Sequence, residues 1–121
     1  MGLRVLLAED DPVLREILSE GLAEEGFVVA AARSGAEAMD WYRRDGAYDA
    51  LLLDEEMPGM TGRQLLRRLR EAGDHIPALI ISGNLELDEA EQRALGVGPV
   101  LRKPIPLAEL GRALRALVPS K

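Results

Sequence analysis

Three short polar clusters in this chain each follow an apolar run, and their residue types suit phosphoryl chemistry. The clusters are Glu9-Asp10-Asp11, Asp54-Glu55-Glu56 and Lys103-Pro104. Carboxylates gathered at one point repel one another, and a hard cation such as Mg²⁺, which prefers oxygen ligands, relieves that repulsion. A carboxylate can also attack a phosphoryl group as a nucleophile, while an ammonium group binds the phosphoryl oxygens. These residue types predict a site for phosphoryl transfer with a divalent cation.

The elements that would position these clusters are alternating apolar and amphipathic segments. The predicted strands are residues 3–8, 27–31, 49–53, 77–81 and 100–101. The predicted helices, with their capping residues, are 12–26, 34–46, 61–72, 86–95 and 106–117. Strict alternation predicts an α/β fold, a doubly wound (βα)5 sandwich whose five parallel strands take the flavodoxin-like order 2-1-3-4-5. In that order Asp10 and Asp54 face each other across one crevice, and Ser82 and Lys103 open onto the same edge.

Several side chains have predicted local roles in this fold. We expect Asp11 to cap the first helix, and Ser34 to form a capping box with Glu37 at the start of the second. Glu55 is expected to be exposed. The fourth helix is mostly polar, and its predicted apolar stripe consists of Leu87, Ala90, Ala94 and Leu95.

The composition of the whole chain limits the functions that are open to it. Its 121 residues are 47% hydrophobic and 30% charged, which predicts one globular domain over 1–121. The absence of Cys excludes disulfides and thiolate metal sites. The net charge of -6 argues against direct binding to nucleic acid. No apolar stretch could span a membrane and no signal peptide is evident, so we expect a cytoplasmic location, with no output domain after the last helix.

The order and spacing of four motifs resemble the receiver domain of response regulators in two-component signalling, and the resemblance covers the whole chain. The motifs are Ala8-Glu9-Asp10-Asp11-Pro12, residues 53–62, Ile80-Ile81-Ser82-Gly83 and Arg102-Lys103-Pro104. The resemblance implies that Asp54 accepts a phosphoryl group from a sensor histidine kinase or a phosphotransfer protein. It also implies a bound Mg²⁺ or Mn²⁺ ion, with ligands from Glu9, Asp10, Asp54 and the backbone carbonyl of Glu56.

The same resemblance assigns roles to residues on the last two strands. Ser82 would bond a phosphoryl oxygen, Lys103 would pair with the phosphoryl group, and the Lys103–Pro104 peptide would be cis. Val100 stands at a switch position where the family usually has Tyr or Phe, and the stretch from Ser82 to Lys103 is shorter than in most relatives. The fourth helix, fifth strand and fifth helix would present an altered face to an unknown output partner. Homodimerisation is an open alternative.

Three functions compete at this point. The first is a phosphorylation switch, which promotes only its own phosphorylation and dephosphorylation and is not an enzyme acting on an external metabolite. The second is a pseudo-receiver that binds partners without phosphorylation. Val100 and the short fourth-helix region favour it, whereas the intact set of site residues opposes it. The third is a phosphatase like the haloacid dehalogenases, which would require a second Asp two residues after the nucleophile. Glu56 and Pro12 occupy those positions, which argues against the third function.

Overall fold

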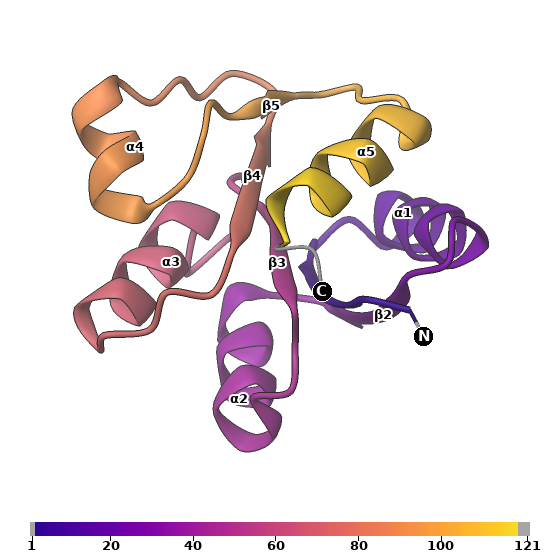
Figure 1. The fold of residues 1–121 in the computed structure, drawn as a ribbon, viewed down its shortest axis with the longest axis horizontal. Helices are drawn as coiled ribbons and strands as arrows, with labels where there is room; N and C mark the ends of the chain where they lie inside the picture. The colour runs from indigo at the N-terminus through magenta and orange to yellow at the C-terminus, as the bar shows by residue number, and fades with distance from the viewer. Residues whose placement is uncertain (1, 119–121) are drawn as a thin grey trace.

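The computed structural model describes residues 2–118, which form a five-stranded parallel sheet with helices on both faces (Figure 1). The strands are β1 (Arg4–Ala8), β2 (Val28–Ala32), β3 (Ala50–Asp54), β4 (Ala78–Ser82) and β5 (Leu101–Arg102). The helices are α1 (Pro12–Glu24), α2 (Gly35–Asp45), α3 (Gly62–Glu71), α4 (Glu89–Leu95) and α5 (Leu107–Leu117). The strand order β2-β1-β3-β4-β5 confirms the predicted fold.

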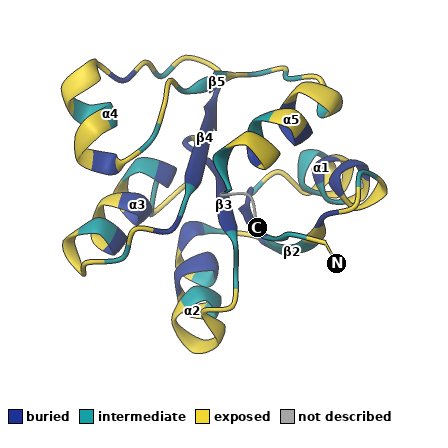
Figure 2. Cartoon of the chain, viewed as in Figure 1, coloured by how far each residue is buried: buried dark blue, intermediate teal, exposed yellow. Residues whose placement is uncertain are grey.

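The core lies in two layers because successive side chains of a strand point to opposite faces of the sheet. Leu6 and Ala8 of β1 pack in the layer beneath α2, α3 and α4. Val5 and Leu7 pack in the layer beneath α1 and α5. The neighbouring strands β3 and β4 are buried along their whole length, as the dark blue arrows of Figure 2 show. Strands that are buried on both faces have continuous apolar sequences, and for this reason both strands were predicted well from the sequence.

The register of the sheet brings the polar clusters to one edge. Ala8 pairs with Leu53, so the residues that follow β1 and β3 emerge side by side. Ser82 pairs with Arg102, so the last residue of β4 lies beside the start of the Lys103-Pro104 cluster. All four segments leave the sheet at their carboxyl ends, the usual place for a ligand site in an open α/β sheet.

The helix caps confirm one of the two capping predictions in full. Asp11 caps α1, and its Oδ1 atom accepts a hydrogen bond from the Val13 N–H at 2.9 Å. At α2 the Ser34 hydroxyl accepts from the Glu37 N–H at 3.1 Å, as predicted. The reciprocal bond is not formed, because the Glu37 carboxylate accepts instead from the N–H of Arg33 at 2.8 Å. The predicted box is therefore half formed.

The fourth helix differs most from its prediction. It begins at Glu89 rather than at residue 86, because Asp88 is its N-cap and accepts from the Glu91 N–H at 2.8 Å. Of the predicted apolar stripe, Leu87 and Leu95 are buried, but Ala90 and Ala94 are exposed. The helix has only seven residues, so few of its side chains can face the core. Leu87, just before the N-cap, and Leu95, the last residue of the helix, are the leucines that anchor it. Figure 1 shows α4 at the outer end of its layer, next to α3.

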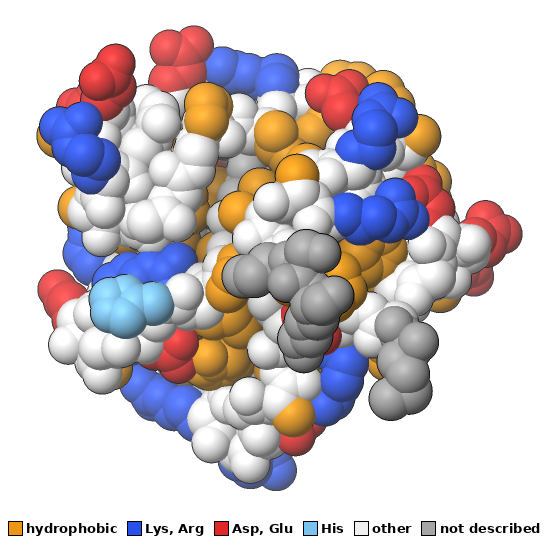
Figure 3. All heavy atoms as spheres, in the orientation of Figure 1, with side chains coloured by type: hydrophobic (Ala, Val, Ile, Leu, Met, Phe, Trp, Pro, Cys, Tyr) orange, Lys and Arg blue, Asp and Glu red, His pale blue; other side chains and the backbone are white. Residues whose placement is uncertain are grey.

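The surface carries charges of both signs. Figure 3 shows acidic and basic side chains interspersed around this face of the molecule, with apolar surface between them. Across residues 2–118, none of the helices combines the length and apolar character that a membrane crossing requires.

Candidate functional site

Three carboxylates converge where β1 and β3 end. Oxygen atoms of Glu9, Asp10 and Asp54 all lie within 4.8 Å of one another. Glu9 and Asp54 are each only 1% exposed, whereas Asp10 is half-buried. Burying a charged carboxylate is strongly unfavourable unless a positive charge or hydrogen-bond donors lie beside it. The neighbours of these three carboxylates therefore determine how the cluster is stabilised.

Lys103 supplies the positive charge in this cluster. Its Nζ atom lies 2.8 Å from Asp54 Oδ1 and 3.5 Å from Glu9 Oε1. Burial alone would lower the pKa of Lys103, but the hydrogen bond and charge of Asp54, with the charges of Glu9 and Glu56, raise that pKa above its ordinary value. The lysine is therefore held firmly in its charged form. Its peptide bond to Pro104 is cis, as the resemblance implied.

One positive charge does not balance three carboxylates. Burial, the largest cause, and the neighbouring Asp54 together raise the pKa of Glu9 to about 7, although the backbone N–H of Asp11 lowers it. The Oε1 atom of Glu9 is buried and accepts no hydrogen bond from the described residues, although Lys103 faces it as an ion pair. An all-oxygen group with excess negative charge and an unsatisfied acceptor fits Mg²⁺ or Mn²⁺. Glu9, Asp10 and Asp54 are the side chains that could hold such an ion.

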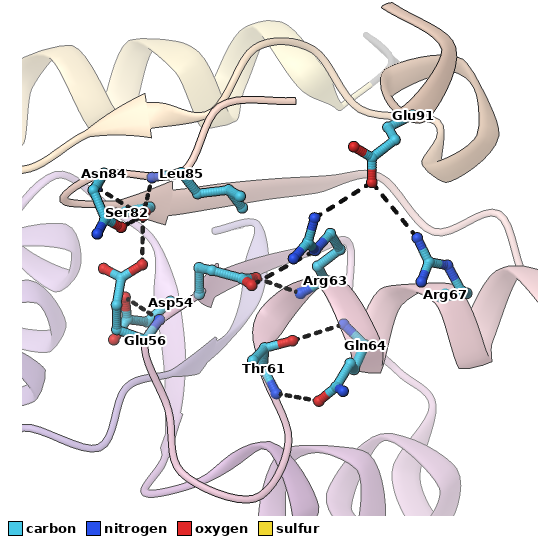
Figure 4. Close-up of polar contacts among 11 residues, drawn as sticks. Asp54, Glu56, Thr61, Arg63, Gln64, Arg67, Ser82, Asn84, Leu85 and Glu91 are labelled. Atoms are coloured by element: carbon cyan, nitrogen blue, oxygen red, sulfur yellow. Dashed lines mark hydrogen bonds and ion pairs between the residues drawn. The ribbon is translucent and has the colours of Figure 1, made fainter. Parts of the chain in front are cut away.

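Ser82 and Glu56 form a bonded pair across the crevice. The Ser82 hydroxyl donates to the Glu56 carboxylate (Figure 4). The same carboxylate accepts from the Gly83 N–H at 2.9 Å. The Ser82 oxygen accepts from the backbone N–H groups of Asn84 and Leu85 at 3.1 and 2.9 Å. Ser82 is completely buried, so its hydroxyl has all its partners inside the protein. A ligand that needs this hydroxyl must displace Glu56.

Glu55 was predicted to be exposed, and this prediction is wrong. Its residue is only 7% exposed, and its Oε1 atom accepts from the Arg63 N–H at 2.8 Å. The Glu55 N–H donates to the carbonyl of Ile81 at 2.9 Å, so sheet pairing continues one residue beyond β3. This extension aims the side chain at the start of α3, whose first N–H groups lack partners within the helix. The basic side chain of Arg63, eight residues downstream and 3.7 Å from Glu55 Oε2, is a signal in the sequence for this partnership.

Val100 is half-buried at the entrance to β5. It lines a hollow of about 260 Å³ together with Leu85, Leu87 and Pro99. The hollow also reaches Glu86 and Arg102, which form an ion pair at 3.1 Å. The whole stretch from residue 82 to 103 contains no aromatic side chain. The role of Val100 as a switch position stays a prediction.

The structure therefore brings together most of the residues singled out in the sequence. Glu9, Asp10, Asp54 and Lys103 share one crevice. The Ser82–Glu56 pair borders the same crevice, and the Glu56 N–H donates to Asp54 Oδ1 at 3.3 Å. This arrangement offers a carboxylate nucleophile, a fixed ammonium group and oxygen ligands for a cation.

Comparison with known proteins places the chain among signalling proteins. The model of the response regulator receiver domain family matches residues 5–115. Response regulator MprA of Mycobacterium bovis (strain BCG / Pasteur 1173P2) is 36% identical over 122 residues, covering 98% of this chain and 51% of that protein. Transcriptional regulatory protein QseB of Escherichia coli O157:H7 is 38% identical over 120 residues, covering 96% of this chain and 53% of that protein. The chain thus spans about half the length of these curated relatives.

Solved structures agree with this assignment. Chemotaxis protein CheY4 of Vibrio cholerae superposes with a TM-score of 0.86 at 25% identity, covering 98% of this chain and 100% of that one. The receiver domain of the Francisella response regulator 1452 gives a TM-score of 0.83 at 28% identity, covering 96% of each chain. The match of the family model to nearly the whole chain, on a fold with the same strand order, shows that this chain belongs to the response regulator receiver domain family.

Proposed function

We propose that this receiver domain is a phosphoacceptor switch, in which Asp54 takes a phosphoryl group from a sensor histidine kinase or a phosphotransfer protein. The observation that carries the proposal is the 2.8 Å contact between Lys103 Nζ and Asp54 Oδ1 inside a buried group of carboxylates. A lysine placed there binds the phosphoryl oxygens as negative charge gathers on them. A purely structural ion pair would not require two further carboxylates beside it.

The transfer exchanges one bond to phosphorus for another. A carboxylate oxygen of Asp54 forms the new P–O bond while the P–N bond of the phosphohistidine breaks, and the electron pair stays on the imidazole nitrogen. Lys103 holds the phosphoryl oxygens, and Ser82 bonds one of them once Glu56 has released its hydroxyl. A Mg²⁺ ion, bound by the three carboxylates and the Glu56 carbonyl, would neutralise charge on the phosphoryl oxygens.

The surface beside the crevice suits a protein donor. An apolar hollow of about 470 Å³ lies between α1 and the segment after β5 and reaches Lys103. Ile17 lines it, and both Ile17 and Val13 on the same helix are large apolar residues exposed by 50% and 66%. Apolar side chains exposed next to a reactive group are a common feature of a docking surface. A kinase domain or phosphotransfer helix bundle would cover them while presenting its histidine to Asp54.

Phosphorylation by a small donor tests the proposal directly. The protein is incubated with acetyl phosphate and Mg²⁺, and its intact mass is measured. We expect wild type to gain one phosphoryl group, and Asp54→Asn to gain none. Chelation of Mg²⁺ should prevent the reaction in wild type. Wild type that stays unmodified at saturating donor would overturn the proposal.

A second candidate, a pseudo-receiver that binds partners without phosphorylation, is favoured by the half-buried Val100 and by the short strand that follows it. The same assay separates the two functions, because a pseudo-receiver would gain no phosphoryl group from acetyl phosphate. In either case we propose that the signal leaves through α4, β5 and α5 toward an output partner. The relatives are about twice as long, so this partner can be another part of the same protein or a separate one.

A further inference from the structure

We propose that Glu55 is a positioning residue, which couples the phosphoacceptor loop to α4 through Arg63 and Glu91 and holds α4 in the arrangement of the unphosphorylated protein. The inference rests on the proposed function, because it concerns the route by which phosphorylation of Asp54 reaches the surface. We call the three side chains Glu55, Arg63 and Glu91 the acidic–basic link.

Asp54 and the start of α3 are tightly connected. Glu55 follows Asp54 directly, and its N–H is bonded to the carbonyl of Ile81 on β4. A Cβ atom added to Gly62, the first residue of α3, would lie only 2.7 Å from the Asp54 carbonyl oxygen. The end of β3 and the start of α3 are therefore in direct contact. A shift of the Asp54 backbone must move Glu55 and the beginning of α3 with it.

Arg63 is shared between Glu55 and Glu91. Its N–H donates to Glu55 Oε1, and its Nε atom lies 3.7 Å from Glu55 Oε2. Its NH1 group donates to Glu91 Oε2 at 3.4 Å. Figure 4 shows Arg63 reaching from α3 toward Glu91, with Thr61 and Gln64 capping the helix beside it. One guanidinium group thus serves two carboxylates on different elements.

Helix α4 is attached to α3 near both of its ends. Glu91 lies in the first turn of α4 and also pairs with Arg67 at 3.7 Å. At the other end of the helix, Arg70 donates to the Leu95 carbonyl at 2.6 Å. Arginines of α3 therefore hold both ends of α4. At the first turn these contacts are partly exposed ion pairs, which are weak enough for a local event to break.

Phosphorylation of Asp54 would add negative charge near the acidic–basic link. A phosphoryl group brings about -1.5 to -2 charges at neutral pH. This charge would appear on the residue that directly precedes Glu55, at the carboxyl end of β3. It would draw the guanidinium toward β3 and away from Glu91, so the hold on α4 would weaken. Without an aromatic side chain between residues 82 and 103, the acidic–basic link offers a route to α4 that does not depend on Val100.

The test compares Glu91→Gln with the matched control Glu89→Gln. Both substitutions remove one acid from the first turn of α4, so they change the charge near the helix terminus equally. Glu89 is 91% exposed and pairs only weakly, with Arg93 of its own helix at 3.8 Å. The affinity of each intact variant for beryllofluoride with Mg²⁺, a phosphoryl mimic, is measured by NMR titration. Amide hydrogen exchange of residues 89–95 is measured without the mimic.

We expect Glu91→Gln to bind the mimic about two- to fivefold more tightly than wild type, the range that a partly exposed ion pair supplies. Its α4 amides should exchange faster before any mimic is added, while Glu89→Gln matches wild type in both measurements. Unchanged or weaker binding by Glu91→Gln would overturn the inference. Wild type that fails to bind the mimic would overturn the proposed function as well, so the two failures are distinguishable.

Discussion

The two halves of the sheet edge are built differently, although they meet at the same site. Around β3 every strand residue is buried, and Glu9 and Asp54 are fixed with 1% exposure. Around β5 the strand is two residues long and α4 has seven residues. Chemistry on a phosphoryl group needs carboxylates and lysine at fixed distances, whereas a signal needs an element that can move. The fold supplies rigidity on one side and weak attachment on the other.

The forces that act on the two halves differ in kind as well as in amount. The β3 side is held by apolar packing, which is non-directional and opposes any displacement. The α4 side is held at its first turn by Arg63 and Arg67, which are 34% and 51% exposed. Partly exposed ion pairs exchange readily with water, so an added charge can redirect them. The same arginines that attach α4 can thus release it.

The largest expected effect concerns stability on the rigid side. Leu53→Ala should lower the free energy of unfolding by about 2–5 kcal/mol, because Leu53 is fully buried and its removal leaves a cavity. Val100→Ala, which truncates a half-buried side chain on the other side, should cost less than about 1 kcal/mol. Urea unfolding followed by circular dichroism gives both values. Equal losses of unfolding free energy in the two variants would show that the β3 and β5 sides are packed equally tightly.

The next effect is a pH dependence that comes from Glu9. Its pKa is raised from 4.5 to about 7 in the folded protein, so folding favours its protonated form. Without metal, this contribution to stability is present below pH 4.5 and is lost as the pH rises toward 7 and above. The loss should be on the order of 2–3 kcal/mol by pH 8.

The measurement is urea unfolding of metal-free protein at pH 5 and pH 8, for wild type and Glu9→Gln. Glu9→Gln should lose less stability over this range than wild type, because it has no carboxylate to ionise. Addition of Mg²⁺ should stabilise wild type more at pH 8 than at pH 5, since the ion binds the charged carboxylate. Parallel pH profiles for the two proteins would show that Glu9 does not titrate in this range.

A smaller effect is expected where the two halves meet, at the bond between Glu56 and Ser82. Glu56→Gln weakens the acceptor for the Ser82 hydroxyl and removes a negative charge from the crevice. It should tighten binding of beryllofluoride about two- to tenfold, the equilibrium effect of one net hydrogen bond. Glu71→Gln on the exposed surface of α3 is the control and should bind as wild type does. Equal affinities for both variants would mean that Glu56 does not restrain Ser82.

The smallest effect is expected at Val100. Val100→Tyr places a larger side chain beside a hollow of about 260 Å³ that is open to solvent. We expect the free energy of unfolding to change by less than about 0.5 kcal/mol, as for most substitutions outside the packed core. Urea unfolding of both proteins measures this change in free energy. A loss as large as that of Leu53→Ala would show that the β5 side is packed as tightly as the β3 side.

The strand ends, the strand order and most site residues could be predicted from the sequence, because they follow from regular apolar patterns. Apolar runs ending in acids or lysine located three strand ends, and βα alternation then predicted the strand order. Ser82 and Lys103 were found because a strand end fixes where the following residue lies. The start of α4 was misplaced because Asp88 was not recognised as its N-cap among neighbouring acids.

The sequence failed where a side chain depends on a distant partner. Glu55 looked like a surface acid, but one extra sheet bond turns it toward Arg63. Glu37 looked like half of a capping box, but the Arg33 N–H binds its carboxylate instead. In both cases the residue type was compatible with either environment. Tertiary geometry, which local patterns do not contain, made the choice.

The loop after β3 has a consequence for how such a switch can be adapted. Its three consecutive acids meet three separate sets of neighbours: Asp54 contacts Lys103, Glu55 contacts Arg63, and Glu56 contacts Ser82. A substitution at one of these positions leaves the partners of the other two in place. Substitutions can therefore adjust the restraint on Ser82 at Glu56 and the contact with Arg63 at Glu55 as separate traits, while Asp54 itself stays unchanged.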